Sequence, residues 1–431
     1  MKASAWLGRM NTAPIDREEK QAARQAVRLL YICDFPPSNL GGGPILMSRL
    51  LRQHPPDRVV VLTSTRYARV SPREGRLCCE EVTVPISDAW GSWGLGRLRI
   101  LLNWLRIPLV AIAATRIIKR CRVEVMITVL HGQFYFAAAL AAWWTSIPYV
   151  LVVHDDYVTS MRPALNLAGR SLVRAVVRNA AHVYAVSPEM QSTLKAEFGV
   201  ESELHRPATE PVSPHLVKPI RSLRAGSVNL VYAGSITDAV EGNLRLLAEL
   251  IITGKLKEYG VEGAKLHLYT SLKEEQNRAW GWDHPDLVVN GWVPQDELSA
   301  VLRRADILFL PFSFSSGARH TVETAFPSKT ADYLASGRPI LVFGPSYSSL
   351  AGYAAREGFA EVVTESSPEA LARGIQRIAL HAGHAEALTA RALQVFSQYH
   401  DISQQRTQFN EMLNRIAGGK HERSPQASKP A

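Results

Sequence analysis

The sequence predicts an α/β protein of two domains, each built on a doubly wound parallel sheet, and three observations carry that prediction. Apolar, strand-like runs alternate with helical patterns over most of the chain. The alternation is interrupted once, by the proline-rich stretch 207–227, which has no periodicity and is typical of a linker. The length of 431 residues also exceeds what one compact core usually holds.

The expected division of the chain follows from that linker and from composition. Its parts, in chain order, are a flexible N-terminus (1–26), a first Rossmann-like domain (27–206), the linker (207–227), a second Rossmann-like domain (228–400), a closing helix (401–416) and a disordered tail (417–431). Rossmann-like units are expected because buried strands that alternate with helices form parallel sheets covered on both faces.

The first domain opens with the apolar segment Val27–Asp34, which predicts a buried strand, followed by a loop and a helix over 44–54. The uncharged run Phe134–Val153 is long enough to raise the question of a membrane span. Pro148 interrupts it, so a buried helix, a turn and a buried strand explain it better. The other predicted strands are 58–64, 123–130, 149–154 and 182–187.

In the second domain the alternation restarts with shorter apolar runs. Helical patterns lie between them and continue from Pro368 to about Ile416. The predicted strands are 229–235, 264–271, 287–293, 306–312, 339–344 and 360–365.

A short helix with marked ends is predicted within FPSKTADYLASGRP, residues 326–339. A Pro-Ser pair starts it, and Gly337 ends it before the next strand. Lys329 and Asp332 are three residues apart and share one face of that helix. Such a pair can bind a nucleotide, the ammonium contacting a phosphate and the carboxylate contacting the ribose hydroxyls. The alternative is an ordinary solvated ion pair.

Further candidate sites follow predicted strands, where parallel α/β sheets bind ligands. Gly42 and Gly43, and later Gly234 and Ser235, offer backbone donors to a phosphate, although the first loop is alternatively a flexible connection without a ligand. His154 ends a strand and can bind a sugar hydroxyl or move a proton, with a structural histidine as the alternative.

The loop 312–329 precedes the short helix and carries Arg319, His320 and Glu323. A loop of this composition is either a substrate-binding segment or an ordinary surface excursion. The first interpretation is favoured because of the neighbouring helix.

Composition narrows the function classes. Four cysteines have neither metal-ligand spacing nor a disulfide pattern, which fits a reducing cytoplasm. The first residues lack the pattern of a secretory signal. The formal net charge is +10, but no nucleic-acid-binding motif accompanies it, so a nucleic-acid partner is not expected.

Every charged residue between Gly91 and Val123 is basic, and these cations alternate with aromatic and aliphatic residues. Pro108 is expected to divide the segment into two helices. Basic amphipathic helices bind anionic membranes, which predicts a peripheral position at the inner face of the cytoplasmic membrane. A solvated outer helix is the equal alternative. The candidate membrane or acceptor surface comprises Arg97, Arg99, Trp104, Arg116, Lys119 and Arg120.

Together these segments resemble the retaining family 4 of the GT-B glycosyltransferases, which assemble polysaccharides and glycolipids. The resemblance runs from about Val27 to Tyr399 and is most specific in PSKTADYLASGRPIL, similar to the family element P-x-K-x-x-E-Y-x-A-x-G-x-P. It implies two Rossmann-like domains facing a central cleft. There a sugar moves from a nucleotide-diphosphate sugar to a glycan or lipid-linked acceptor, with no cofactor and no metal.

The resemblance also implies a role for each candidate residue, including a ribose-binding carboxylate that is one methylene shorter than the usual glutamate. The assignments are Gly42 and Gly43 closing over the diphosphate, His154 contacting the donor sugar, Trp292 and Val293 meeting the base, Lys329 binding the diphosphate and Asp332 binding the ribose.

Two departures from the family pattern are visible. The upstream glutamate of the family falls on Thr324, so the neighbouring Glu323 is the catalytic candidate only if the loop shifts. The loop after Gly234 lacks the usual phosphate-neutralising cations, which leaves Lys329, Arg319 or helix dipoles to compensate. A GT-B nucleotide-sugar epimerase and a degenerate, non-catalytic nucleotide-sugar-binding protein therefore stay open as alternatives.

Overall fold

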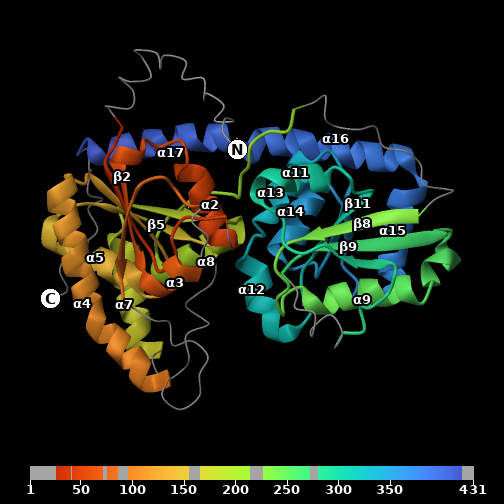
Figure 1. Ribbon diagram of the computed structural model, residues 1–431, viewed down its shortest axis with the longest axis horizontal. Helices are drawn as coiled ribbons and strands as arrows, with labels where there is room; N and C mark the ends of the chain where they lie inside the picture. Colours follow the sequence, from red (N-terminus) through yellow and green to blue (C-terminus); the bar gives the residue numbers. More distant parts are fainter. Residues whose placement is uncertain are drawn as a thin grey trace, which may run out of the picture.

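The computed structural model describes residues 26–39, 41–70, 75–85, 96–154, 166–213, 227–271 and 280–419. These residues form two parallel sheets, each with helices packed on both faces, and the two units lie side by side (Figure 1). The predicted fold class, an α/β protein of two Rossmann-like domains, is confirmed.

The first sheet is parallel throughout its described strands, in the order β3-β2-β1-β4-β5-β6-β7. Its central strands are buried along their whole length because helices cover both faces: Leu30 of β1 packs into one layer and Leu29 into the other. The sequence did not predict β3 and β7, since β3 is half-exposed and β7 very short. The strands are β1 (Leu29–Ile32), β2 (Val59–Ser64), β3 (Glu80–Val84), β4 (Val125–Val129), β5 (Tyr149–Val153), β6 (His182–Ala185) and β7 (Glu203–Leu204).

Helices α4, α5 and α7 neighbour one another on one face of this sheet. The run Phe134–Val153 forms α5 and β5, and no helix among the described residues is long and apolar enough to cross a membrane. The helices are α2 (Gly42–Leu51), α3 (Thr65–Val70), α4 (Gly96–Cys121), α5 (Phe134–Thr145), α7 (Asn166–Asn179) and α8 (Pro188–Phe198), with a 3₁₀ turn at Pro56–Arg58.

The expectation that Pro108 separates two helices is wrong, because α4 continues through it. The proline removes one backbone hydrogen bond. Ile107 and Val110 on either side of it are buried against the sheet, and this packing keeps the helix continuous.

The second sheet is also parallel, in the order β10-β9-β8-β11-β12-β13. Its strands are β8 (Ser227–Ala233), β9 (Gly263–Tyr269), β10 (Leu287–Val289), β11 (Ile307–Pro311), β12 (Ile340–Phe343) and β13 (Glu361–Val363). Its helices are α9 (Glu241–Ile252), α11 (Gln295–Leu302), α12 (Arg319–Thr324), α13 (Lys329–Ala335), α14 (Ser349–Glu357), α15 (Pro368–Leu380) and α16 (Ala382–Tyr399), with 3₁₀ turns at Lys255–Tyr259 and Ser316–Ala318.

The last helix, α17 (Ile402–Ala417), returns to the first domain. Figure 1 shows α16 along the second unit and α17 along the first. Phe409 and Leu413 of α17 are buried in the same cluster as Leu29 of β1. Where the chain recrosses, Thr209 and Asp401 form a parallel bridge, so the two crossing segments lie against each other.

Candidate active site

A cavity of about 530 Å³ lies between the two domains, beyond the carboxyl ends of both sheets. Parallel sheets place ligands at this edge because the strand ends and the following loops converge there. The predicted residues that line it are Gly42, Gly43 and His154 from the first domain and Gly234, Ser235, Trp292, Val293, Lys329 and Asp332 from the second.

Lys329 begins α13, and its ammonium is enclosed at the cavity wall. Its Nζ donates a hydrogen bond to Tyr232 Oη at 2.7 Å and lies 3.9 Å from the centre of the Tyr232 ring. Among the described residues no carboxylate pairs with it. Burial therefore lowers the pKa of Lys329 from its ordinary value of 10.5 to about 7. An anion that entered the cavity would favour the charged form of this amine.

Asp332, one turn further along α13, pairs with Arg49 of the first domain. Arg49 donates to Asp332 Oδ1 at 2.7 Å, and the two side chains are only 8% and 12% exposed. Arg49 is not among the site residues predicted from the sequence. One feature of the sequence could have indicated it: Arg49 is the one charged residue in the otherwise mostly apolar segment ILMSRLL of a predicted helix.

The glycines of the first domain lie where the domains touch. A Cβ added to Gly42 would lie 3.2 Å from Ser328 Oγ, and one added to Gly43 would lie 3.2 Å from the His154 ring. The glycines form the first turn of α2, where the backbone approaches both the start of α13 and His154 more closely than a side chain permits. Both glycines also line the cavity, so their backbone forms part of its wall.

His154 follows β5, and its Nε2 atom is buried without a hydrogen-bond partner among the described residues. Burial, reinforced by the neighbouring His205 and His131, lowers the pKa of His154 to about 3. The imidazole is therefore neutral at physiological pH. A neutral ring with an open nitrogen suits a hydrogen bond to a ligand hydroxyl.

Gly234 contributes in another way than the sequence predicts. Its N–H donates to Tyr269 O at 3.0 Å within the sheet, so that amide does not face a phosphate. A Cβ on Gly234 would lie 2.6 Å from Lys329 Nζ, and its φ is 143°. The glycine therefore makes room for the lysine. Ser235 accepts a hydrogen bond from Tyr232 Oη through its carbonyl at 2.6 Å.

Aromatic side chains of the second domain form part of the cavity wall. Trp292, which is 47% exposed, and Val293 follow β10. Trp280 also lines the cavity and packs edge-on against Trp282, with ring centroids 4.8 Å apart. The sequence analysis did not single out Trp280, because no local pattern places it near the cavity. A flat aromatic surface beside open backbone suits a planar base.

The structure does not bring Arg319 and Glu323 to the cavity. Both lie on α12 and are absent from the cavity wall. Arg319 Nε donates to Glu323 Oε1 at 2.8 Å, and the guanidinium stacks over Tyr347. Four-residue spacing places the pair on one exposed helix face, while Thr321 lies on the cavity side.

The basic surface also differs from expectation in part. Trp104 packs half-buried against Phe136, so it is a core residue, and Arg120 forms an ion pair with Glu80. Arg116 and Lys119 are exposed on α4. The side chains of Arg97 and Arg99 lie outside the described residues.

Two family profiles match the chain. Residues 56–206 match Glycosyltransferase Family 4, and residues 249–411 match a family described as glycosyl transferase-like. The two matches correspond to the first and second domains. No curated protein sequence matches the chain.

Solved structures with the same arrangement cover nearly the whole chain. HepE from Anabaena, solved with UDP and glucose, is 14% identical, with a TM-score of 0.63 over 90% of this chain and 99% of HepE. Sucrose-phosphate synthase from Thermosynechococcus elongatus is 13% identical, with a TM-score of 0.64 over 91% and 99%. MurG from Acinetobacter baumannii is 14% identical, with a TM-score of 0.53 over 90% and 99%. At these identities the likeness shows the shared GT-B fold.

Proposed function

We propose that this chain, which belongs to the glycosyltransferases of the GT-B type, transfers a hexose-type sugar from a nucleotide-diphosphate sugar to a glycan or lipid-linked hydroxyl, with retained configuration. One observation carries the proposal: Lys329 and Asp332 share a cavity with the glycine loop and His154 of the opposite domain. The proposed setting is the synthesis of a cell-surface polysaccharide or glycolipid, without a cofactor or metal.

In the proposed reaction the bond between the anomeric carbon and the diphosphate breaks while the acceptor oxygen attacks from the same face. Negative charge grows on the departing diphosphate, and Lys329 stabilises it in the transition state. His154 holds a hydroxyl of the sugar. The departing phosphate oxygen accepts the proton of the acceptor hydroxyl, so the carbon–oxygen bond forms without a separate base.

The carboxylates of the cavity support this front-face route. Asp332 is the only carboxylate among the described lining residues, and Arg49 already pairs with it. A covalent sugar intermediate needs a free carboxylate nucleophile. An epimerase, the alternative enzyme, would be expected to carry several acid/base carboxylates, whereas the described lining residues include Asp332 as their one carboxylate.

The wild-type protein is expected to be stabilised against heat by nucleoside diphosphates and their sugars. At a hundredfold excess over Kd, the gain is about 2.7 kcal/mol. A thermal-shift panel of UDP, GDP, ADP and dTDP, with the matching nucleosides as controls, measures it. If no diphosphate shifts the melting temperature, the donor site does not exist as proposed, and a degenerate protein becomes the better interpretation.

A peripheral membrane position, with an anionic bilayer as partner, completes the proposal. Leu105 and Leu109 of α4 and Trp143 of α5 are 65%, 62% and 79% exposed. Helical spacing places Leu105 and Leu109 on the same face of α4 as the exposed cations Arg116 and Lys119, and α5 packs beside α4. Exposed apolar side chains beside exposed cations favour the interface of an anionic bilayer.

Flotation with vesicles containing phosphatidylglycerol is expected to carry the wild-type protein. The double variant Arg116→Gln and Lys119→Gln should bind about 30-fold more weakly at low salt, since each cation contributes about 1 kcal/mol. Lys255→Gln with Lys257→Gln removes two exposed cations from the second domain and serves as the matched control. Equal loss in both variants would show a net-charge effect and refute this surface.

A further inference from the structure

Arg49 connects the acceptor-side domain to the ribose carboxylate of the donor side. It lies on α2, about two turns after Gly42 and Gly43 begin that helix at the cavity. One guanidinium nitrogen donates to Ala208 O at 2.9 Å, in the segment that crosses between the domains, and another donates to Asp332 Oδ1 at 2.7 Å. Helix α2 therefore carries both the glycines that line the cavity and the arginine that pairs with Asp332.

The backbone of Arg49 is held as firmly as its side chain. Arg406 of α17 donates to Arg49 O through Nε at 2.9 Å and through a second guanidinium nitrogen at 2.6 Å. Arg406 is itself 5% exposed and pairs with Glu210 at 2.8 Å. The crossing segment at Ala208 thus holds the Arg49 guanidinium, and Arg406 of α17 holds the Arg49 backbone.

The pair leaves half of the carboxylate available to a ligand. Arg49 occupies Oδ1 of Asp332, while Oδ2 receives no hydrogen bond from any described residue. Asp332 lines the cavity and keeps 12% of its side chain exposed. A carboxylate fixed through one oxygen presents the other in a defined direction.

We propose that Arg49 is the positioning residue for Asp332, so that the ribose hydroxyls of the donor are recognised only when the two domains are in contact. This rests on the proposed function. The short Asp332 side chain reaches the ribose in a fixed direction because Arg49 prevents other rotamers. Loosening of the domain contact would release Arg49 and weaken the hold on the ribose.

The test compares UDP with 2′,3′-dideoxy-UDP, which lacks both ribose hydroxyls, by calorimetry. The wild-type protein is expected to prefer UDP by about 10- to 100-fold, the value of a hydrogen bond to a charged group. Arg49→Met should reduce this preference to about threefold or less, with Arg49→Lys intermediate. The preference for UDP over UMP, which reports the diphosphate contacts, should stay unchanged in both variants.

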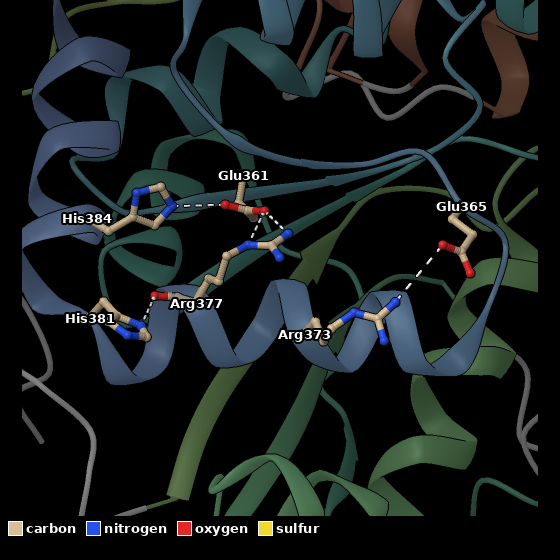
Figure 2. A network of polar contacts seen from close by, with 6 residues as sticks. All are labelled: Glu361, Glu365, Arg373, Arg377, His381 and His384. Atoms are coloured by element: carbon tan, nitrogen blue, oxygen red, sulfur yellow. Dashed lines mark hydrogen bonds and ion pairs between the residues drawn. The ribbon is translucent and has the colours of Figure 1, made fainter.

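The matched control removes another arginine–carboxylate pair of the second domain. Figure 2 shows Arg377 and His384 converging on Glu361, a cluster whose residues do not line the cavity. Arg377→Met should leave the ribose preference at the wild-type value. Circular dichroism establishes that each variant is folded, and Arg49→Lys carries the test if Arg49→Met is not.

Two outcomes overturn the assignment. If a folded Arg49 variant binds UDP and dideoxy-UDP more weakly by the same factor, Arg49 has only a structural role. If the wild-type protein binds neither UDP nor any other nucleoside diphosphate, the proposed function fails, and this inference fails with it. The first result leaves the proposed function intact, so the two failures are distinguishable.

Discussion

Lys329→Met is expected to lower kcat/KM for sugar transfer by about a thousandfold, the scale of losing a preorganised charge on a leaving group. The fall in kcat/KM should exceed that caused by removing a phosphate contact at the protein surface, because the loop after Gly234 carries no lysine or arginine that could replace the charge of Lys329. Radiolabelled sugar transfer at saturating acceptor measures the effect. Lys257→Met, an exposed lysine of the second domain, is the control and should retain full activity.

The protonation of Lys329 provides an independent measurement. With a pKa of about 7, the Lys329 amine of the unliganded protein is mostly uncharged at pH 8, and a bound diphosphate favours its charged form. Binding of UDP should therefore take up close to one proton at pH 8 and much less at pH 6. Calorimetry in buffers of different ionisation enthalpy counts these protons. Identical uptake by Lys329→Met would assign them to another group.

The lowered pKa of Lys329 also makes the free energy of unfolding depend on pH in a known direction. Its pKa in the folded state lies below the ordinary 10.5, so the unfolded chain binds more protons between pH 7 and 10.5. Stability from this group therefore rises with pH across that window. Lys329→Met should flatten the rise, which urea unfolding at pH 7 and pH 9 detects.

His154→Ala is expected to lower kcat by about a hundredfold while the affinity for UDP changes little. UDP carries no sugar, and the neutral imidazole is assigned to a sugar hydroxyl. His267→Ala in the second domain, whose ring bonds Asn229 away from the cavity wall, is the control. An equal loss of UDP affinity and kcat would place His154 on the nucleotide instead.

The pH dependence separates this role from general base catalysis. With its pKa lowered to about 3, His154 does not titrate between pH 5 and pH 8. The pH profile of kcat should therefore keep its shape in His154→Ala. Loss of a limb in that range would show that His154 exchanges a proton during the reaction.

The lowered pKa of His154 also affects the stability of the fold. Between pH 6.5 and pH 3 this imidazole is protonated in the unfolded chain but not in the folded protein, so His154 destabilises the fold as the pH falls through that window.

Local pattern was sufficient for features that depend on neighbouring residues alone. The strand of Tyr149–Val153 could be predicted because a parallel strand covered on both faces is apolar throughout. Lys329 and Asp332 could be placed on one face of α13 because three-residue spacing and the helix ends determine it. Pro108 misled the prediction, since packing outweighed the loss of one hydrogen bond.

The sequence by itself therefore determined the two α/β units, the helix that carries Lys329 and Asp332, and the strand ends at which His154 and the glycines lie. Only the tertiary structure decided which of those groups share a cavity. In the folded protein Arg319 and Glu323 pair with each other on an exposed face of α12, and the Gly234 amide donates a hydrogen bond within the sheet. Arg49 contacts Asp332, although the two residues are 283 positions apart in the chain. The physical reason is that burial, which sets the charge of Lys329 and encloses the ion pair of Asp332, arises from contacts between distant segments that no local pattern records.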